Sequence, residues 1–248
     1  IAMLNAALKI VDQNPLGSAA GYGSSFPIDR TFTTKELGFE TLKYNSVAAQ
    51  MSRGKSEKTV AFAMSSVAAT LAKFSMDVCL YMSQNFDFIT LPSHLTTGSS
   101  IMPHKKNPDV FELIRGKCNK IQALPYEITL ITNNLPSGYH RDLQLLKEGL
   151  FPAIQNLKAC LDIALFSIKD IKVKEHILDD KKYDYLFTVD SLNEMVVAGM
   201  PFRDAYKAVA EQLENGTFQS PKETKHTHEG SINNLCLDAI KEKMRASF

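Results

Sequence analysis

The stretch from Gly98 to Pro108 carries residue types that could do acid–base chemistry on an anion, and it reads G-S-S-I-M-P-H-K-K-N-P. Its glycine and serines favour a mobile backbone. Lys105 and Lys106 bring positive charge, and Asn107 followed by proline is typical of a helix start, with asparagine as the N-cap. Free N–H groups and the helix dipole add to that charge. The pattern predicts an anion-binding loop, and a solvated Gly/Ser loop remains the alternative.

The same stretch resembles the shared loop of the fumarase/aspartase superfamily, G-S-S-x-M-P-x-K-x-N-P, at every fixed position. The next nine residues, D-V-F-E-L-I-R-G-K, resemble its argininosuccinate lyase branch. A second, independent segment from Pro136 to Lys147, P-S-x-Y-x-x-D-L-Q-x-x-K, resembles the part of these lyases that holds argininosuccinate. The second match favours this branch over fumarase, aspartase and adenylosuccinate lyase.

The activity that the resemblance implies is a β-elimination, cleaving argininosuccinate to arginine and fumarate. Such a reaction needs a base, positive charge for the aci-carboxylate that forms, and an acid for the leaving nitrogen. By resemblance Ser99 is the base, Lys105 holds the carboxylate where charge develops, and Asn107 donates to that carboxylate. The alternatives are a flexible-loop serine and an asparagine that only caps the helix.

Four further residues complete the implied site. The resemblance implies that Glu112 orients a histidine of another subunit, although a glutamate near a helix N-terminus is favourable without any function. Lys147 would face a substrate carboxylate, while Tyr139 and Gln144 would donate hydrogen bonds. Gln144 and Lys147 are three residues apart, so we expect them on one helical face; such a face is usually solvated.

Other polar clusters have weaker patterns. The loop from Leu16 to Arg30 resembles a lyase segment that would put Arg30 near the mouth of the site, supporting local structure; a surface pair with Asp29 or Glu36 is equally compatible. His226 and His228 lack a third ligand pattern, so no metal is expected. No nicotinamide or flavin motif is present, and the elimination requires no cofactor. We expect His104 to be loop surface outside the site.

The elements that position these residues are long helices. Apolar residues advance strictly by four and three from Val60 to Tyr81, which predicts a bundle helix over about 56–88. At roughly 50 Å it would be too long for a compact monomer, so we expect it to pack against other subunits. Further helices are predicted over 108–135, kinked at Pro125, and 142–168, bent at Pro152.

The predicted fold is all-α, with a long-helix central bundle of the fumarase/aspartase type over residues 1–181 and a small C-terminal helical domain over 182–248. Short helices are expected at 174–181, 191–198, 201–214 and 231–246, and no sheet is expected. The chain begins inside an amphipathic pattern, so we expect it to be the carboxy-terminal part of a lyase, without the amino-terminal histidine and without a complete site.

The composition is typical of a soluble globular protein. The net charge is +1, with 44% hydrophobic and 22% charged residues, so no nucleic-acid or membrane partner is implied. Four dispersed cysteines are typical of reduced core residues in a cytoplasmic protein. The family resemblance implies a homotetramer whose sites combine several chains. Another superfamily lyase, or a non-catalytic crystallin-like or assembly module, remains an alternative.

Overall fold

The computed structural model describes residues 1–247, and these form two compact units, Ile1–Val173 and the part of the chain from Lys174 onward. The chain is all-α apart from very short strands, which agrees with the predicted fold class. The predicted domain boundary after residue 181 stays a prediction. Each unit is described by itself.

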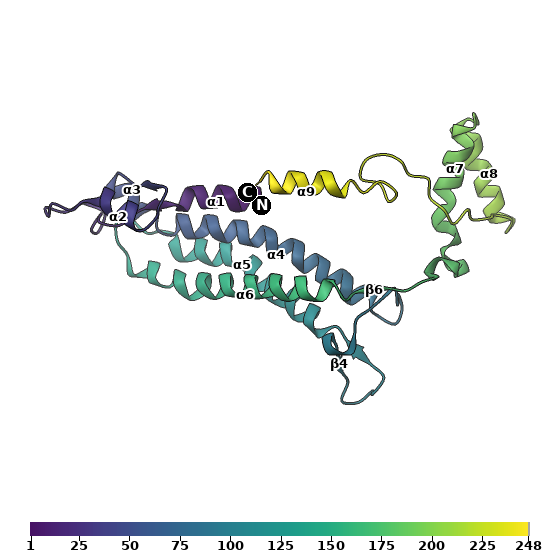
Figure 1. Cartoon of the computed structure of the whole chain (residues 1–248), viewed down its shortest axis with the longest axis horizontal. Coiled ribbons are helices and arrows are strands. Elements are labelled where there is room, and N and C mark those ends of the chain that lie inside the picture. Colours follow the sequence, from purple (N-terminus) through teal and green to yellow (C-terminus); the bar gives the residue numbers. More distant parts are fainter. Residues whose placement is uncertain (248) are drawn as a thin grey trace. The chain divides into compact units, whose positions relative to one another are not determined.

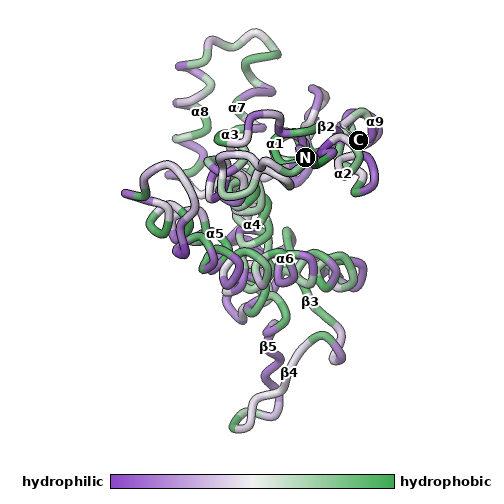
Figure 2. The backbone as a smooth tube through the Cα atoms, turned by 90° about the vertical axis from the view of Figure 1, so that its left-hand side faces the viewer, coloured by the Kyte–Doolittle hydropathy of each residue, from purple (hydrophilic) through white to green (hydrophobic). Residues whose placement is uncertain are grey.

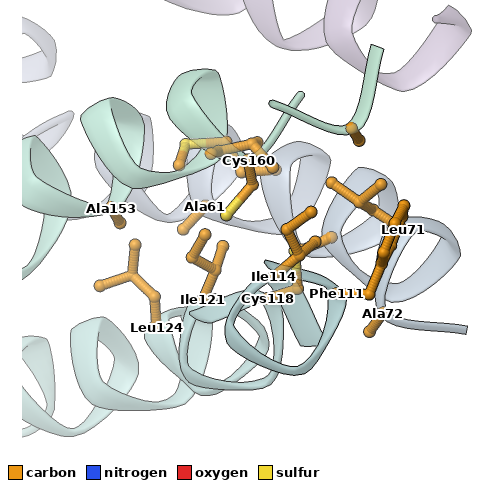
Figure 3. Close-up of a cluster of buried hydrophobic side chains, with 14 of the residues drawn as sticks. Ala61, Leu71, Ala72, Phe111, Ile114, Cys118, Ile121, Leu124, Ala153 and Cys160 are labelled. Atoms are coloured by element: carbon orange, nitrogen blue, oxygen red, sulfur yellow. The ribbon is translucent and has the colours of Figure 1, made fainter. Parts of the chain in front are cut away.

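The first unit is built on three long helices, α4 (Lys55–Tyr81), α5 (Asp109–Thr132) and α6 (Leu146–Ile168). They lie side by side along the bundle (Figure 1). Their buried side chains form one apolar core, in which Phe111, Ile114 and Cys118 are almost completely inaccessible. Figure 3 shows these α5 side chains between Leu71 of α4 and Cys160 of α6.

The predicted heptad stripe is the buried face of α4 for most of its length. Met64, Leu71 and Val78 are buried, and the residues between them pack partly against the core. The helix ends at Tyr81 and not near residue 88, so its length is about 40 Å. Tyr81 instead packs against Phe86 and Phe88 as the chain turns away. This aromatic cluster is a tertiary contact that local periodicity does not encode.

The other two helices agree with their predicted positions to within a few residues. α5 and α6 each continue through their internal prolines, Pro125 and Pro152. Hydrophobic and hydrophilic residues alternate along α6 in Figure 2, as expected for a helix with one face in a core. Gly149 of α6 lies so close to α5 that an added Cβ would stand 2.9 Å from Leu124. A larger residue at this position would therefore require the Leu124 and Glu127 side chains to shift.

Shorter elements surround the bundle. The helices are α1 (Ala2–Val11), α2 (Arg30–Glu36), α3 (Ser46–Met51) and the 3-10 turns η1 (Ser93–Leu95) and η2 (Arg141–Gln144). Three strand pairs of two residues each were not expected: β1 (Gln13–Asn14) with β2 (Thr41–Leu42), β3 (Ile89–Thr90) with β6 (Lys172–Val173), and β4 (Thr97–Gly98) with β5 (Lys106–Asn107). Only the first pair is parallel.

The second unit is helical and has a small core of its own. Its elements are η3 (Ile177–Asp179), η4 (Lys181–Phe187), α7 (Thr188–Val197), α8 (Phe202–Glu214) and α9 (Leu237–Arg245). Leu192 of α7 packs against Ala205 and Val209 of α8. Three of the predicted short helices, 191–198, 201–214 and 231–246, correspond to α7, α8 and α9 with shifted ends. The helix predicted over 174–181 is wrong, because that stretch contains the three-residue 3-10 turn η3.

Two helical stretches of the described residues, Lys55–Tyr81 and Arg141–Ile168, pass a length and composition test for a membrane span. Core helices of soluble proteins pass the same test, and both stretches supply core side chains of the bundle.

Candidate active site

The predicted catalytic loop is the tip of a two-stranded hairpin. Thr97 of β4 pairs with Asn107 of β5, and Gly98 pairs with Lys106. The hairpin projects from the helices (Figure 2). At its tip the Ser99 hydroxyl oxygen accepts hydrogen bonds from the backbone N–H groups of Ile101 and Met102, at 3.2 and 3.0 Å. Ser99 therefore lies outside any helix, in a segment whose local hydrogen bonds fix its hydroxyl.

A cleft of about 820 Å³ opens beside the base of this hairpin. Three of the predicted site residues line it: Lys105, Asn107 and Glu112. Ser99 is not among the lining residues in this conformation. His104, expected outside the site, is exposed and also lines the cleft. The hairpin also contributes Met102 and Lys106, and the opposite wall comes from the end of α4 and the segment that follows it, including Cys79 and Leu91.

Asn107 is not the N-cap that its sequence pattern predicts. It is a strand residue of β5, and α5 begins at Asp109 with Pro108 in the cap position and no side-chain cap. Proline disfavours helical backbone angles in the residue before it, so Asn107 is extended and free to pair with Thr97. The carboxylate of Asp109 accepts a hydrogen bond from the Thr97 N–H at 3.1 Å. The aspartate thus joins the hairpin to α5.

Glu112 is exposed in the first turn of α5, where the helix dipole favours its charge. Partial burial raises the pKa of the Cys79 thiol, the Arg115 guanidinium lowers that pKa, and the Glu112 carboxylate raises it. Cys79, expected in the core, is a half-buried cleft residue. Its place in a helical pattern gave no signal of this.

The second predicted cluster lies in the turn between α5 and α6. The Gln144 amide donates to the Tyr139 hydroxyl at 3.3 Å. Gln144 ends η2, whereas Lys147 lies exposed in the first turn of α6, so the two are not on one continuous helix. Tyr139 remains 45% exposed. Tyr139 and Gln144 thus form a polar pair, and Lys147 follows on the exposed side of the first turn of α6.

The two clusters lie at opposite ends of α5, as Figure 1 shows for the β4 hairpin and the turn into α6. A helix of 24 residues separates them by about 36 Å. One chain therefore brings together Lys105, Asn107 and Glu112, with Ser99 on the adjoining hairpin, and separately Tyr139 with Gln144. It does not bring all seven residues into one site.

Arg30 is a structural residue in this chain. Its guanidinium donates to the backbone carbonyls of Leu16, Lys43 and Tyr44 at 2.7–3.0 Å. It thereby closes the Gly/Ser-rich loop onto the segment before α3. This contact set differs from both expected carboxylate pairs, because backbone carbonyls and not Asp29 or Glu36 occupy its donors.

The His226 ring pairs with the Asp190 carboxylate at 2.9 Å and stacks near His228. Within residues 1–247 no group of three or more His, Cys, Asp or Glu side chains is arranged to hold a metal ion.

The sequence and the fold were compared with those of known proteins. A family model described as Lyase matches residues 1–123. The argininosuccinate lyase of Parabacteroides distasonis is 60% identical over 244 residues, which cover 98% of this chain and 55% of that protein. The argininosuccinate lyase of Phocaeicola vulgatus is 59% identical over 242 residues, or 98% of this chain and 54% of that protein. The chain spans about half the length of the curated relatives it matches.

A solved structure shares the fold. Class II fumarase from Schistosoma mansoni superposes with a TM-score of 0.71 and 16% identity, over 98% of this chain and 51% of that one. The similarity covers both the long-helix bundle and the residues after it.

Proposed function

This chain belongs to the argininosuccinate lyase family, and on that premise we propose that the whole protein cleaves argininosuccinate reversibly to arginine and fumarate, the last step of arginine biosynthesis. One structural observation supports the proposed reaction. Lys105, Asn107 and Glu112 line a single cleft at the base of the hairpin that carries Ser99. A cationic side chain and an amide donor on one wall suit a dicarboxylate.

In the proposed reaction Ser99 removes the proton next to a substrate carboxylate. The two N–H groups that donate to its hydroxyl oxygen support this role, because they would stabilise a serinate more than a neutral hydroxyl. Lys105 holds the carboxylate on which negative charge builds up, and Asn107 donates to it. The carbon–nitrogen bond then breaks, its electron pair stays with the arginine nitrogen, and a general acid protonates that nitrogen as fumarate forms.

For this step the hairpin has to close over the substrate, since Ser99 does not line the cleft in the present conformation. Hairpin closure would also exclude water, which strengthens the electrostatic contribution of Lys105. Glu112 is proposed to orient a histidine supplied by another subunit. Its exposed position in the first turn of α5 leaves the carboxylate accessible to a second chain.

Tyr139, Gln144 and Lys147 are proposed to bind the argininosuccinate moiety in a site completed by a second chain. What supports this is their position at the far end of α5, about 36 Å from the cleft by helix length. A substrate that touches both clusters therefore requires two copies.

We propose a cytoplasmic homotetramer built on the bundle. Its helices expose large apolar side chains that a monomer would leave in water, including Leu113, Tyr126, Leu130, Phe151, Leu165 and Phe166. We further propose that the 248 residues alone lack a complete site.

The test is a substrate panel on the full-length enzyme. Fumarate release from argininosuccinate is compared with release from adenylosuccinate and aspartate, and with malate dehydration. We expect turnover of argininosuccinate alone. A higher kcat/KM for any of the other three substrates than for argininosuccinate would assign the chain to a different lyase. If none of the four substrates is turned over, a structural role is favoured. The 248-residue chain, assayed in parallel, should be inactive.

A further inference from the structure

Arg53 lies in the turn between α3 and α4 and reaches the turn that carries the Tyr139 cluster. One guanidinium nitrogen, Nη2, donates to the backbone carbonyl of Leu143 at 3.1 Å, ninety residues along the chain. Its Nε donates to Oε1 of Glu57 at 3.1 Å. The other Glu57 oxygen accepts the backbone N–H of Gly54 at 2.6 Å. Arg53 thus joins two segments distant in sequence, and Glu57 holds the arginine from within its own segment.

The environment makes this contact stronger than a surface ion pair. The Arg53 and Glu57 side chains are only 31% and 18% exposed, and the Leu143 side chain is buried. Leu143 lies within η2, directly before Gln144. Holding its carbonyl therefore fixes the backbone from which that amide reaches the Tyr139 hydroxyl. A guanidinium can serve two acceptors in fixed directions at once, which a lysine ammonium on a flexible chain does less well.

We infer that Arg53 is a positioning residue for substrate binding. It touches none of the proposed reacting groups and acts through Leu143, by holding η2 so that Tyr139, Gln144 and Lys147 present one surface to the substrate. The expected effect on KM rests on the proposed function. The hydrogen bond by which Arg53 holds η2 is independent of that function.

The experiment uses the full-length enzyme with Arg53→Gln, Arg53→Lys and Glu57→Gln, and with Arg203→Gln as the control. Arg203 is an exposed arginine of α8. We expect Arg53→Gln to raise KM for argininosuccinate about tenfold, with kcat within about threefold of wild type. Arg53→Lys should be intermediate, because it keeps the charge and can reach one acceptor. Glu57→Gln should also be intermediate, and Arg203→Gln should match wild type.

A merely structural role predicts a different result. Arg53→Gln would then lower the concentration of working sites, and therefore kcat, with KM unchanged; that outcome overturns the inference. A second measurement is independent of turnover: hydrogen exchange at the backbone amides of Leu143 and Leu145, which bond within η2, should be faster in Arg53→Gln than in Arg203→Gln. Unchanged exchange overturns the inference even if the enzyme acts on another substrate. If these amides exchange faster in Arg53→Gln but the wild-type enzyme does not turn over argininosuccinate, only the proposed function is wrong.

Discussion

The backbone N–H of Thr97 and the carboxylate of Asp109 form a 3.1 Å hydrogen bond that ties the hairpin carrying Ser99 to the first turn of α5. Thr97 begins β4, and Asp109 begins the helix that carries Glu112. The bond therefore sets where the hairpin base lies relative to the cleft, while the tip beyond Gly98 is held only by its own strand pairing and local bonds. A hairpin with a fixed base and a free tip is suited to closing over a substrate.

Replacing Asp109 by alanine should loosen the hairpin base without unfolding the bundle. Loss of one charge-assisted hydrogen bond at a partly exposed site costs about 1 kcal/mol of local opening free energy, or about fivefold in amide protection. We expect this loss at the Thr97 amide in hydrogen exchange, with unchanged protection in α4. Asp238→Ala, in exposed α9, is the control. Equal protection of Thr97 in both variants would mean that the bond does not hold the hairpin.

Ser99→Ala should abolish most turnover in the full-length enzyme. Removing a general base typically costs about 10²–10⁴-fold in rate, and we expect the loss in kcat while KM changes little. Ser100→Ala is the matched control, since the neighbouring serine is exposed and has no proposed role. Steady-state fumarate release measures both. If Ser100→Ala loses turnover and Ser99→Ala keeps it, Ser100 is the base. Normal turnover in Ser99→Ala rules out Ser99 as the base.

Lys147→Ala should act on binding. Because Lys147 is proposed to face a substrate carboxylate far from Ser99, its loss should raise KM for argininosuccinate about tenfold and affect kcat less. Lys158→Ala, an exposed lysine further along α6, is the control. An unchanged KM in Lys147→Ala would remove the support that this segment gives to the choice of substrate.

Gly54→Ala should destabilise the junction between α4 and α5. Gly54 has a φ of +80°, and an added Cβ would stand 2.4 Å from Cγ2 of Thr132. Left-handed strain and overpacking together should cost about 3 kcal/mol of unfolding free energy. Thr132→Ser removes the clashing methyl group, so the double variant should recover about 1 kcal/mol. Gly116→Ala, with open space at its Cβ in the middle of α5, should be neutral or stabilising.

Denaturant unfolding of the full-length protein followed by circular dichroism measures these differences. Additive effects of Gly54→Ala and Thr132→Ser would show that the backbone angle alone carries the cost.

The sequence was sufficient for the bundle because its information is local. The apolar spacing from Val60 to Val78 defines one face of α4 whatever lies opposite it, and the structure buries that face. The end of α4 was missed because the turn after Tyr81 depends on packing against Phe86 and Phe88. The strict apolar spacing itself stops at Tyr81, where the helix ends, so extending the predicted helix to about residue 88 went beyond that pattern.

The candidate site residues were proposed from motif wording, which did not predict their local geometry. Asn107 has the composition of an N-cap, but its strand partner Thr97 is ten residues away and determines its conformation. The resemblance indicated a local structural role for Arg30, but nothing in the sequence identified its partners or any role for Arg53. Both arginines bind backbone carbonyls, which every residue possesses. Such partners become apparent only when the loops are placed in space.

Arg30→Ala should destabilise the loop that precedes α2. Its three hydrogen bonds to carbonyls join Leu16 to Lys43 and Tyr44, and their loss should cost about 2 kcal/mol. Lys35→Ala, exposed in the same helix, is the control. Limited proteolysis should cut residues 16–28 faster in Arg30→Ala only. Equal cutting rates in both variants would assign the loop's order to other contacts.

Cys118 should make stability depend on pH in the alkaline range. Burial, with Cys160 beside it, raises the pKa of its thiol from 9.0 to about 12. The folded protein then keeps a proton that the unfolded chain loses above about pH 9, so stability is full below pH 9 and falls as pH rises toward 12. Cys118→Ala removes this contribution. Its unfolding free energy should therefore approach that of wild type as pH increases from 8 to 10, whereas a constant difference across that range would show that the thiol titrates normally.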